Sequence, residues 1–251
     1  MQAEAGWFSL TGDPGQLPTR FGLSLVDQMT GVALAYAALC GIIRARASGE
    51  GGDVDVSLFD VALSNLGYPA IWYLNNGHVQ KRLARSAHPT LTPCQLYKTA
   101  DGWIYLMCNK EKFWPVLCGA LGHAEWTDDP RFKTFKERFE NRPQIQDMLD
   151  EALSGKTTAE WLDAFAGIVP AAPINDIDQA LENPFVAGEG RLQDIELEGH
   201  GTYRYLRPPV RTDAPDPARP APGLSEHTDA LLIDIGYDEA KLKSLRKSKV
   251  I

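Results

Sequence analysis

L-S-L-V-D-Q-M-T-G-V-A-L-A-Y-A-A-L-C-G-I-I-R-A-R-A-S-G-E-G-G-D-V-D-V-S-L-F-D-V-A-L, residues 23–63, is the stretch of sequence that decides the fold. Its small and apolar residues predict a closely packed helix over 27–47, which a glycine-rich segment then ends. Residues 53–57 alternate as in a β-strand, and a second helix is expected over 58–74. The order helix, strand, helix is typical of one half of a doubly wound α/β sheet.

Asp27 stands at the junction between the apolar run 23–26 and the expected helix. A carboxylate there can accept hydrogen bonds from the first N–H groups of the helix, which makes it a candidate N-cap worth about 1 kcal/mol. The same N–H groups and the helix dipole stabilise an anion that could act as a nucleophile or a base. Position alone leaves both roles open.

The block around Asp27 belongs to a longer, ordered set of motifs. These are Gln2-Ala3-Glu4-Ala5-Gly6, Ser9-Leu10-Thr11-Gly12, Thr19-Arg20-Phe21-Gly22, Val54-Asp55-Val56-Ser57-Leu58-Phe59-Asp60, Tyr97-Lys98-Thr99-Ala100-Asp101-Gly102, Asp129-Pro130-Arg131-Phe132 with Asn141-Arg142, Val169-Pro170-Ala171-Ala172-Pro173 and His227-Thr228-Asp229. In order and spacing the set resembles the family III CoA-transferases (CaiB/BaiF-like). That superfamily also contains the α-methylacyl-CoA racemases.

The resemblance implies a function and a site. Asp27 matches the catalytic aspartate of the family, and Gln2, Ala3 and Leu58 match positions that lie near the substrate. The substrates would be an acyl-CoA and a small carboxylic acid, with coenzyme A as substrate and product and no permanently bound cofactor. From the residues alone, Gln2 is equally an ordinary loop residue and Leu58 an ordinary core residue.

The resemblance also implies an architecture. We expect an α/β fold with an incomplete Rossmann-like large domain and an inserted smaller α+β domain, in an interlocked homodimer. The large domain would comprise residues 1–75, which carry Asp27, and the C-terminal return 190–251. The small domain would span 88–185. Relative to the family the N-terminal third is absent, and in relatives that third carries most of the adenine and phosphate contacts to CoA.

Two alternatives remain. An α-methylacyl-CoA racemase would pair Asp27 with a histidine that, in the family, lies just before the point where this chain starts. A truncated, non-catalytic member would only support assembly. Lys81, Arg82 and Arg85 are candidates to pair with a free carboxylate of a substrate, although such a run is also typical of a solvated surface.

Charge and composition narrow the classes of partner. The net charge of −8 argues against nucleic acid, because phosphate binding needs a basic face. No apolar run approaches the roughly 18 to 20 residues of a membrane span, and the first residues lack the features of a signal peptide. We therefore expect no membrane partner and a cytoplasmic location. The four cysteines have no CxxC spacing, and no Cys/His set has the spacing of a zinc site, so no metal is expected.

Overall fold

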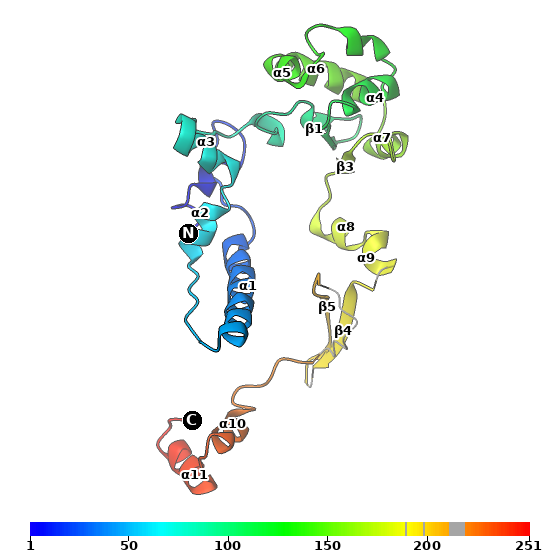
Figure 1. The fold of residues 1–251 in the computed structure, drawn as a ribbon. Helices are drawn as coiled ribbons and strands as arrows, with labels where there is room; N and C mark the ends of the chain where they lie inside the picture. The colour runs from blue at the N-terminus through cyan, green and yellow to red at the C-terminus, as the bar shows by residue number, and fades with distance from the viewer. Residues whose placement is uncertain (189, 198, 211–218) are drawn as a thin grey trace. The chain divides into compact units, whose positions relative to one another are not determined.

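The computed structural model describes residues 1–188, 190–197, 199–210 and 219–251. The chain divides into two compact units, Met1–Ile174 and Asn175–Ile251 (Figure 1). The described residues form a mixed α/β fold of helices with two small antiparallel sheets.

The first unit begins with the 3₁₀ turn η1 (Trp7–Ser9) and the long helix α1 (Leu25–Ser48). Ser24 is the N-cap residue of α1, and Gly49 ends the helix in the left-handed conformation with φ of 77°. The helix therefore starts two residues earlier than expected. Only Val26 is buried along it, and much of its apolar surface faces outward.

By length and composition α1 could cross a bilayer, since an 18-residue window has a mean hydropathy of 1.5. This is the one such helix among the described residues, and helices of soluble proteins also pass the same test. The observation is therefore weak evidence for a membrane span.

Two predictions for the segment after α1 are wrong. Residues 53–57 are not a strand, because they pair with none of the strands among the described residues and a strand needs a paired neighbour. The single helix expected over 58–74 is two helices, α2 (Leu58–Ser64) and α3 (Tyr68–Asn76). Gly67, with φ of 57°, and Pro69 in the first turn of α3 interrupt the helical hydrogen bonding between them.

A three-stranded sheet and four α-helices form the rest of the first unit. In chain order the elements are η2 (Ala84–Ser86), β1 (Cys94–Lys98), β2 (Trp103–Met107), α4 (Phe113–Ala120), η3 (Ala124–Asp128), α5 (Phe135–Glu140), α6 (Arg142–Leu153), α7 (Thr158–Phe165) and β3 (Ala171–Pro173). The strands run antiparallel in the order β1-β2-β3, and Leu96 pairs with Tyr105. Strands β1 and β2 form a hairpin, and Thr157 and Glu160 form a capping box at the start of α7.

The main core lies in this part of the chain. It contains aromatic and aliphatic side chains from the sheet and from α4, α6 and α7, among them Tyr97, Leu106, Trp114, Leu149 and Phe165. The Arg138 side chain is also buried there, with 1% of its surface exposed. Its guanidinium donates to the carbonyls of Thr92 and Phe132, at 2.9 and 2.8 Å, and pairs with Glu111. Arg138 thus ties α5 to the segment that leads into β1.

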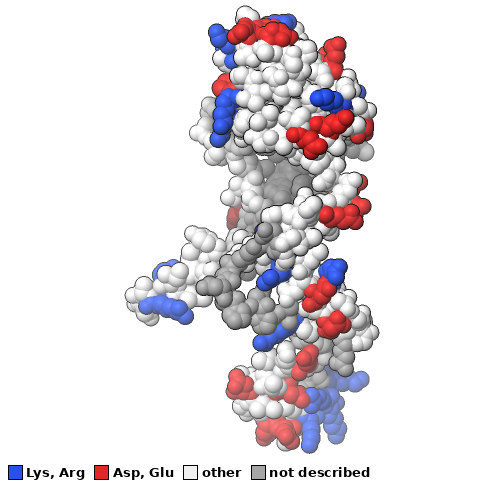
Figure 2. Space-filling view, turned by 90° about the vertical axis from the view of Figure 1, so that its right-hand side faces the viewer, with Lys and Arg blue, Asp and Glu red and all other residues white. Residues whose placement is uncertain are grey.

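The second unit contains short helices and a two-stranded sheet. Its elements are α8 (Ile177–Leu181), α9 (Pro184–Gly188), β4 (Leu192–Leu197), β5 (Gly201–Leu206), α10 (Thr228–Asp234) and α11 (Glu239–Lys247). Arg204 and Asp194 form an ion pair across the two strands, at 2.7 Å. On the face shown in Figure 2, cationic and anionic side chains are interspersed.

Candidate active site

Asp27 lies in the first turn of α1, at its third residue, with its side chain exposed. The N-cap position belongs to Ser24, so the interpretation of Asp27 as the cap is wrong. The carboxylate still lies at the positive end of a 24-residue helix, where unpaired N–H groups favour an anion. This environment suits an ionised carboxylate that acts as a nucleophile.

The first turn of α1 rests on a small apolar cluster. Val26, next to Asp27, is 2% exposed and packs with Ala5 and Ala62, and Trp7 packs against this cluster. The indole Nε1 of Trp7 donates to the carbonyl of Ala62 at 3.0 Å. Three segments that are distant in sequence therefore fix the start of the helix that carries Asp27.

Gln2 holds the loop that precedes this helix. Its side-chain nitrogen donates to the carbonyl of Leu23 at 3.0 Å, and its side-chain oxygen accepts from the N–H of Phe21 at 3.2 Å. The structure thus links Gln2 to the loop two residues before α1. Ala3 follows it and is exposed.

Leu58 is the first residue of α2 and is 39% exposed, so it is not a fully buried core residue. Ser57 caps the helix: its Oγ accepts from the N–H of Asp60 and donates to the Asp60 carboxylate. Among the described residues no hydrogen bond joins Ala3 or Leu58 to Asp27.

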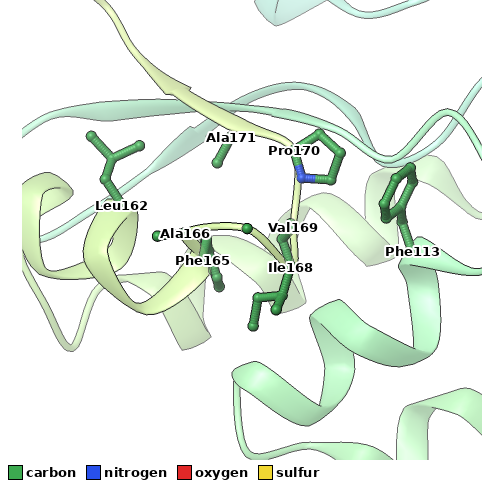
Figure 3. Close-up of a pocket in the computed structure, with 9 residues that line it drawn as sticks. Phe113, Leu162, Phe165, Ala166, Ile168, Val169, Pro170 and Ala171 are labelled. Atoms are coloured by element: carbon green, nitrogen blue, oxygen red, sulfur yellow. The ribbon is translucent and has the colours of Figure 1, made fainter.

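A hollow of about 490 Å³ lies between α1 and α2, and its lining starts at Gln28, the residue after Asp27. Helix α1 contributes Gln28, Met29 and Tyr36, and α2 contributes Val61 and Ser64. Its lining is mostly apolar with a few amides and hydroxyls, which is the usual character of a small-molecule site. A second hollow, of about 370 Å³, lies between α4, α7 and β3 (Figure 3). Its lining residues, which include Phe113 and Phe165, carry no titratable side chain.

His88 has a structural role that the sequence did not reveal. Its Nδ1 accepts from the N–H groups of Thr90 and Leu91, both at 3.2 Å. An accepting Nδ1 is unprotonated, so the proton of the neutral ring lies on Nε2. Burial and then the charge of Arg142 lower the pKa of His88, which favours this neutral form. The ring therefore braces the turn that leads into β1.

The three buried thiols, Cys94, Cys108 and Cys118, are poor candidates for a nucleophile. Burial raises the pKa of Cys108 to about 12 and that of Cys118 to about 11, so both are protonated at neutral pH. Burial also raises the pKa of Cys94. Among the residues that the structure describes, no group of three or more His, Cys, Asp or Glu side chains could hold a metal ion.

Comparison with known proteins identifies the family. A sequence model described as CoA-transferase family III matches residues 1–228. The chain belongs to this family. The match includes Gln2, Ala3, Asp27 and Leu58.

Curated family members share about 30% identity with the chain. The succinate–glutarate CoA-transferase of Agrobacterium fabrum is 30% identical over 238 residues, covering 94% of this chain and 59% of that protein. The human succinyl-CoA:glutarate CoA-transferase is 29% identical over 253 residues, covering 99% of this chain and 58% of that protein. The chain thus spans under two thirds of the length of these relatives.

Two solved structures are similar in fold to this chain. A CaiB/BaiF family protein from Brucella suis matches with a TM-score of 0.72 and 30% identity, covering 93% of this chain and 61% of that chain. The Rv3272 protein of M. tuberculosis matches with a TM-score of 0.79 and 26% identity, covering 90% of this chain and 61% of that chain.

Proposed function

We propose that this protein transfers CoA from an acyl-CoA thioester to a carboxylic acid, with Asp27 as the nucleophile. The observation that carries the proposal is the exposed Asp27 carboxylate in the first turn of α1, inside the family match. The next residue, Gln28, lines the hollow between α1 and α2. The names of the relatives support a small dicarboxylic acid as the acceptor.

The proposed reaction has four steps, and Asp27 is covalently modified in the first three. An oxygen of Asp27 attacks the thioester carbonyl, and cleavage of the C–S bond gives a mixed anhydride and CoA thiolate. The thiolate attacks the aspartyl carbonyl, which releases the donor acid and leaves CoA on Asp27 as a thioester. The acceptor carboxylate displaces CoA to form a second anhydride. The thiolate then attacks the acceptor's acyl carbon, and Asp27 is regenerated as a carboxylate.

The remaining site residues have supporting roles in this proposal. Gln2 fixes the loop before α1 through Leu23, and this positions the turn that carries Asp27. Leu58, partly exposed at the start of α2, contacts the acyl chain. Ala3 contributes a small side chain beside the substrate. Apolar contacts around the site exclude water, which would hydrolyse an anhydride.

The proposed architecture is that of the expected large and small domains. In this proposal residues 1–75 and 190–251 belong to the Rossmann-like domain, and residues 88–185 form the small domain. The β1–β3 sheet, which packs with its helices around one core, is the observation that supports the small domain. We propose an interlocked homodimer, supported by large exposed side chains such as Val32 and Tyr36, which are 72% and 70% exposed. The four free thiols support a cytoplasmic location.

A transfer assay tests the proposed function. The protein is incubated with succinyl-CoA and glutarate, and glutaryl-CoA is measured by chromatography. We expect transfer by the natural protein and a loss of at least about 10³-fold in Asp27→Asn, because loss of a covalent nucleophile removes the reaction path. Asp53→Asn, which changes another exposed carboxylate, is the matched control and should retain the natural rate. Full activity of Asp27→Asn, or no transfer by the natural protein, would contradict the proposal.

A further inference from the structure

A cavity of about 650 Å³ lies beside the first residues of the chain. Its walls come from the segment between Ala3 and Pro18 and from Lys81 and Arg82. Gly6, with φ of 85°, lines it without a side chain, and no atom lies within 4 Å of the place where a Cβ would stand. The cavity is thus open on this side and lined by two cations.

Backbone carbonyls fix the guanidinium of Arg82. Its Nη1 donates to the carbonyls of Gln16 and Leu17, at 2.7 and 3.0 Å, and its Nη2 donates to the carbonyl of Phe8 at 2.6 Å. A carbonyl oxygen orients a cation without neutralising its charge. Of the five N–H groups of an arginine, these bonds use three. The Nε–H and one Nη2–H remain without an acceptor among the described residues.

The two remaining N–H groups belong to Nε and Nη2, which are both bonded to Cζ. Arginine uses N–H groups of this pair of nitrogens to bind the two oxygens of a carboxylate or a phosphate. Because three carbonyls already hold the side chain, little rotamer freedom is lost when a ligand binds. Lys81, exposed on the same cavity wall, adds a second positive charge.

Neighbouring acids do not neutralise this pair of cations in the structure. Asp13 accepts from the backbone N–H of Arg85 at 2.9 Å, and the Arg85 guanidinium pairs with Asp150 at 2.7 Å. Glu4 is exposed, and no ion pair of the described residues joins it to Arg82. Arg85, although close in sequence, is therefore already paired.

We propose that Arg82 and Lys81 bind one oxyanion group of a substrate in this cavity. The inference rests on the proposed function, which supplies two sources of such a group: the second carboxylate of a dicarboxylic acid, and a phosphate of CoA. Ala3 and Gln2 connect the cavity to the site, because Ala3 lines the cavity and Gln2 holds the loop before α1. The short segment Gln2-Ala3 therefore contacts both the cavity and the loop that leads to Asp27.

Equilibrium binding tests the inference without turnover. Calorimetry measures the binding of glutarate, monomethyl glutarate, CoA and dephospho-CoA to the natural protein, to Lys81→Gln and to Arg82→Lys. Lys81→Gln leaves the carbonyl bonds of Arg82 in place, so it reports on the cavity even where Arg82→Lys fails to fold. Lys243→Gln, an exposed cation on α11, is the matched control.

The pattern of losses identifies the source of the anion. A carboxylate in the cavity predicts about 10- to 100-fold weaker glutarate binding in both variants, with monomethyl glutarate binding already weak and unchanged. If the cavity binds the 3′-phosphate of CoA, both variants should bind CoA about 10- to 100-fold more weakly and should bind dephospho-CoA as the natural protein does. Natural affinity of both variants for all four ligands, or no binding by the natural protein, overturns the inference.

This outcome is separable from failure of the proposed function. Full activity of Asp27→Asn in the transfer assay would refute Asp27 as the nucleophile but would not affect the binding results. Unchanged ligand binding by the Lys81 and Arg82 variants would refute the anion site but would not affect the proposed role of Asp27.

Discussion

Replacing Arg138 with methionine should destabilise the core around the β1–β3 sheet more than any comparable change at the surface. The guanidinium is 1% exposed and donates to two backbone carbonyls, those of Thr92 and Phe132. It also lies over the Trp114 ring, with 5.5 Å from Cζ to the ring centroid. Arg138→Met keeps an apolar chain in the core but removes all the donors.

The magnitude follows from the groups left behind. Each buried carbonyl without a donor costs about 1–3 kcal/mol, and Arg138→Met leaves two of them. Glu111 is 53% exposed, so water solvates its carboxylate once the ion pair is lost. We therefore expect a loss of about 2–5 kcal/mol in the free energy of unfolding, which comes mainly from the two carbonyls. A typical domain has only about 5–15 kcal/mol of stability, which makes such a loss easy to measure.

Urea unfolding of the full chain, followed by tryptophan fluorescence, measures this loss. Arg131→Met is the matched control, because the Arg131 side chain is 57% exposed and its ion pair with Asp129 lies at the surface. That control should lose about 0–1 kcal/mol. Hydrogen exchange in residues 92–98 locates the effect, since Arg138 holds Thr92. A loss in Arg138→Met no larger than in Arg131→Met would refute the reasoning.

Two further predictions concern pH and helix capping. Because burial and Arg142 lower the pKa of His88 below 6.5, the unfolded chain binds more protons than the folded one just below that pH. The free energy of unfolding should therefore fall as pH drops below 6.5, and His88→Gln should flatten this slope; an unchanged slope would contradict the prediction. Thr157→Ala removes the cap of α7 and should cost about 0.5–2 kcal/mol in urea unfolding. No loss there would show that the cap contributes nothing.

Local sequence signals account for two features of the first unit. The turn at Asp101-Gly102 marked the β1–β2 hairpin, and the Thr157 capping box marked the start of α7. Both signals depend on residues that are close in sequence, so no tertiary information is needed to read them. Helix α5, which the sequence analysis missed, has only six residues and shows too little periodicity to detect.

The region around Asp27 was harder to predict. The alternation in 53–57 is the same for a paired strand and for an extended segment, and only a neighbouring strand distinguishes them. The break at Gly67 could have been found, because proline favours the first turn of a helix and Pro69 follows Gly67 by two residues. The N-cap was placed at Asp27 because the apolar run 23–26 looked separate from the helix. The structure includes Leu25 and Val26 in the helix, and Ser24 is its cap.

The candidate site was reached mainly through the resemblance. The position of Asp27 alone favoured a role as a helix cap, and the ordered motifs around it favoured the catalytic role instead. The environment of Arg82 could not be predicted, because its carbonyl partners belong to residues 8, 16 and 17, more than 60 positions away. A cluster of cations in a sequence does not show which charge is already paired, as Arg85 is with Asp150.

Chemical trapping tests the central claim, that Asp27 becomes covalently acylated, most directly. The protein is mixed with succinyl-CoA and quenched with hydroxylamine, which attacks an aspartyl anhydride or thioester at the aspartyl carbonyl to give a hydroxamate. Peptide mass spectrometry then locates the modified residue. The account predicts a hydroxamate on Asp27 that depends on acyl-CoA and is absent from Asp27→Asn. A hydroxamate at another residue, or none on Asp27 while CoA transfer proceeds, would contradict it.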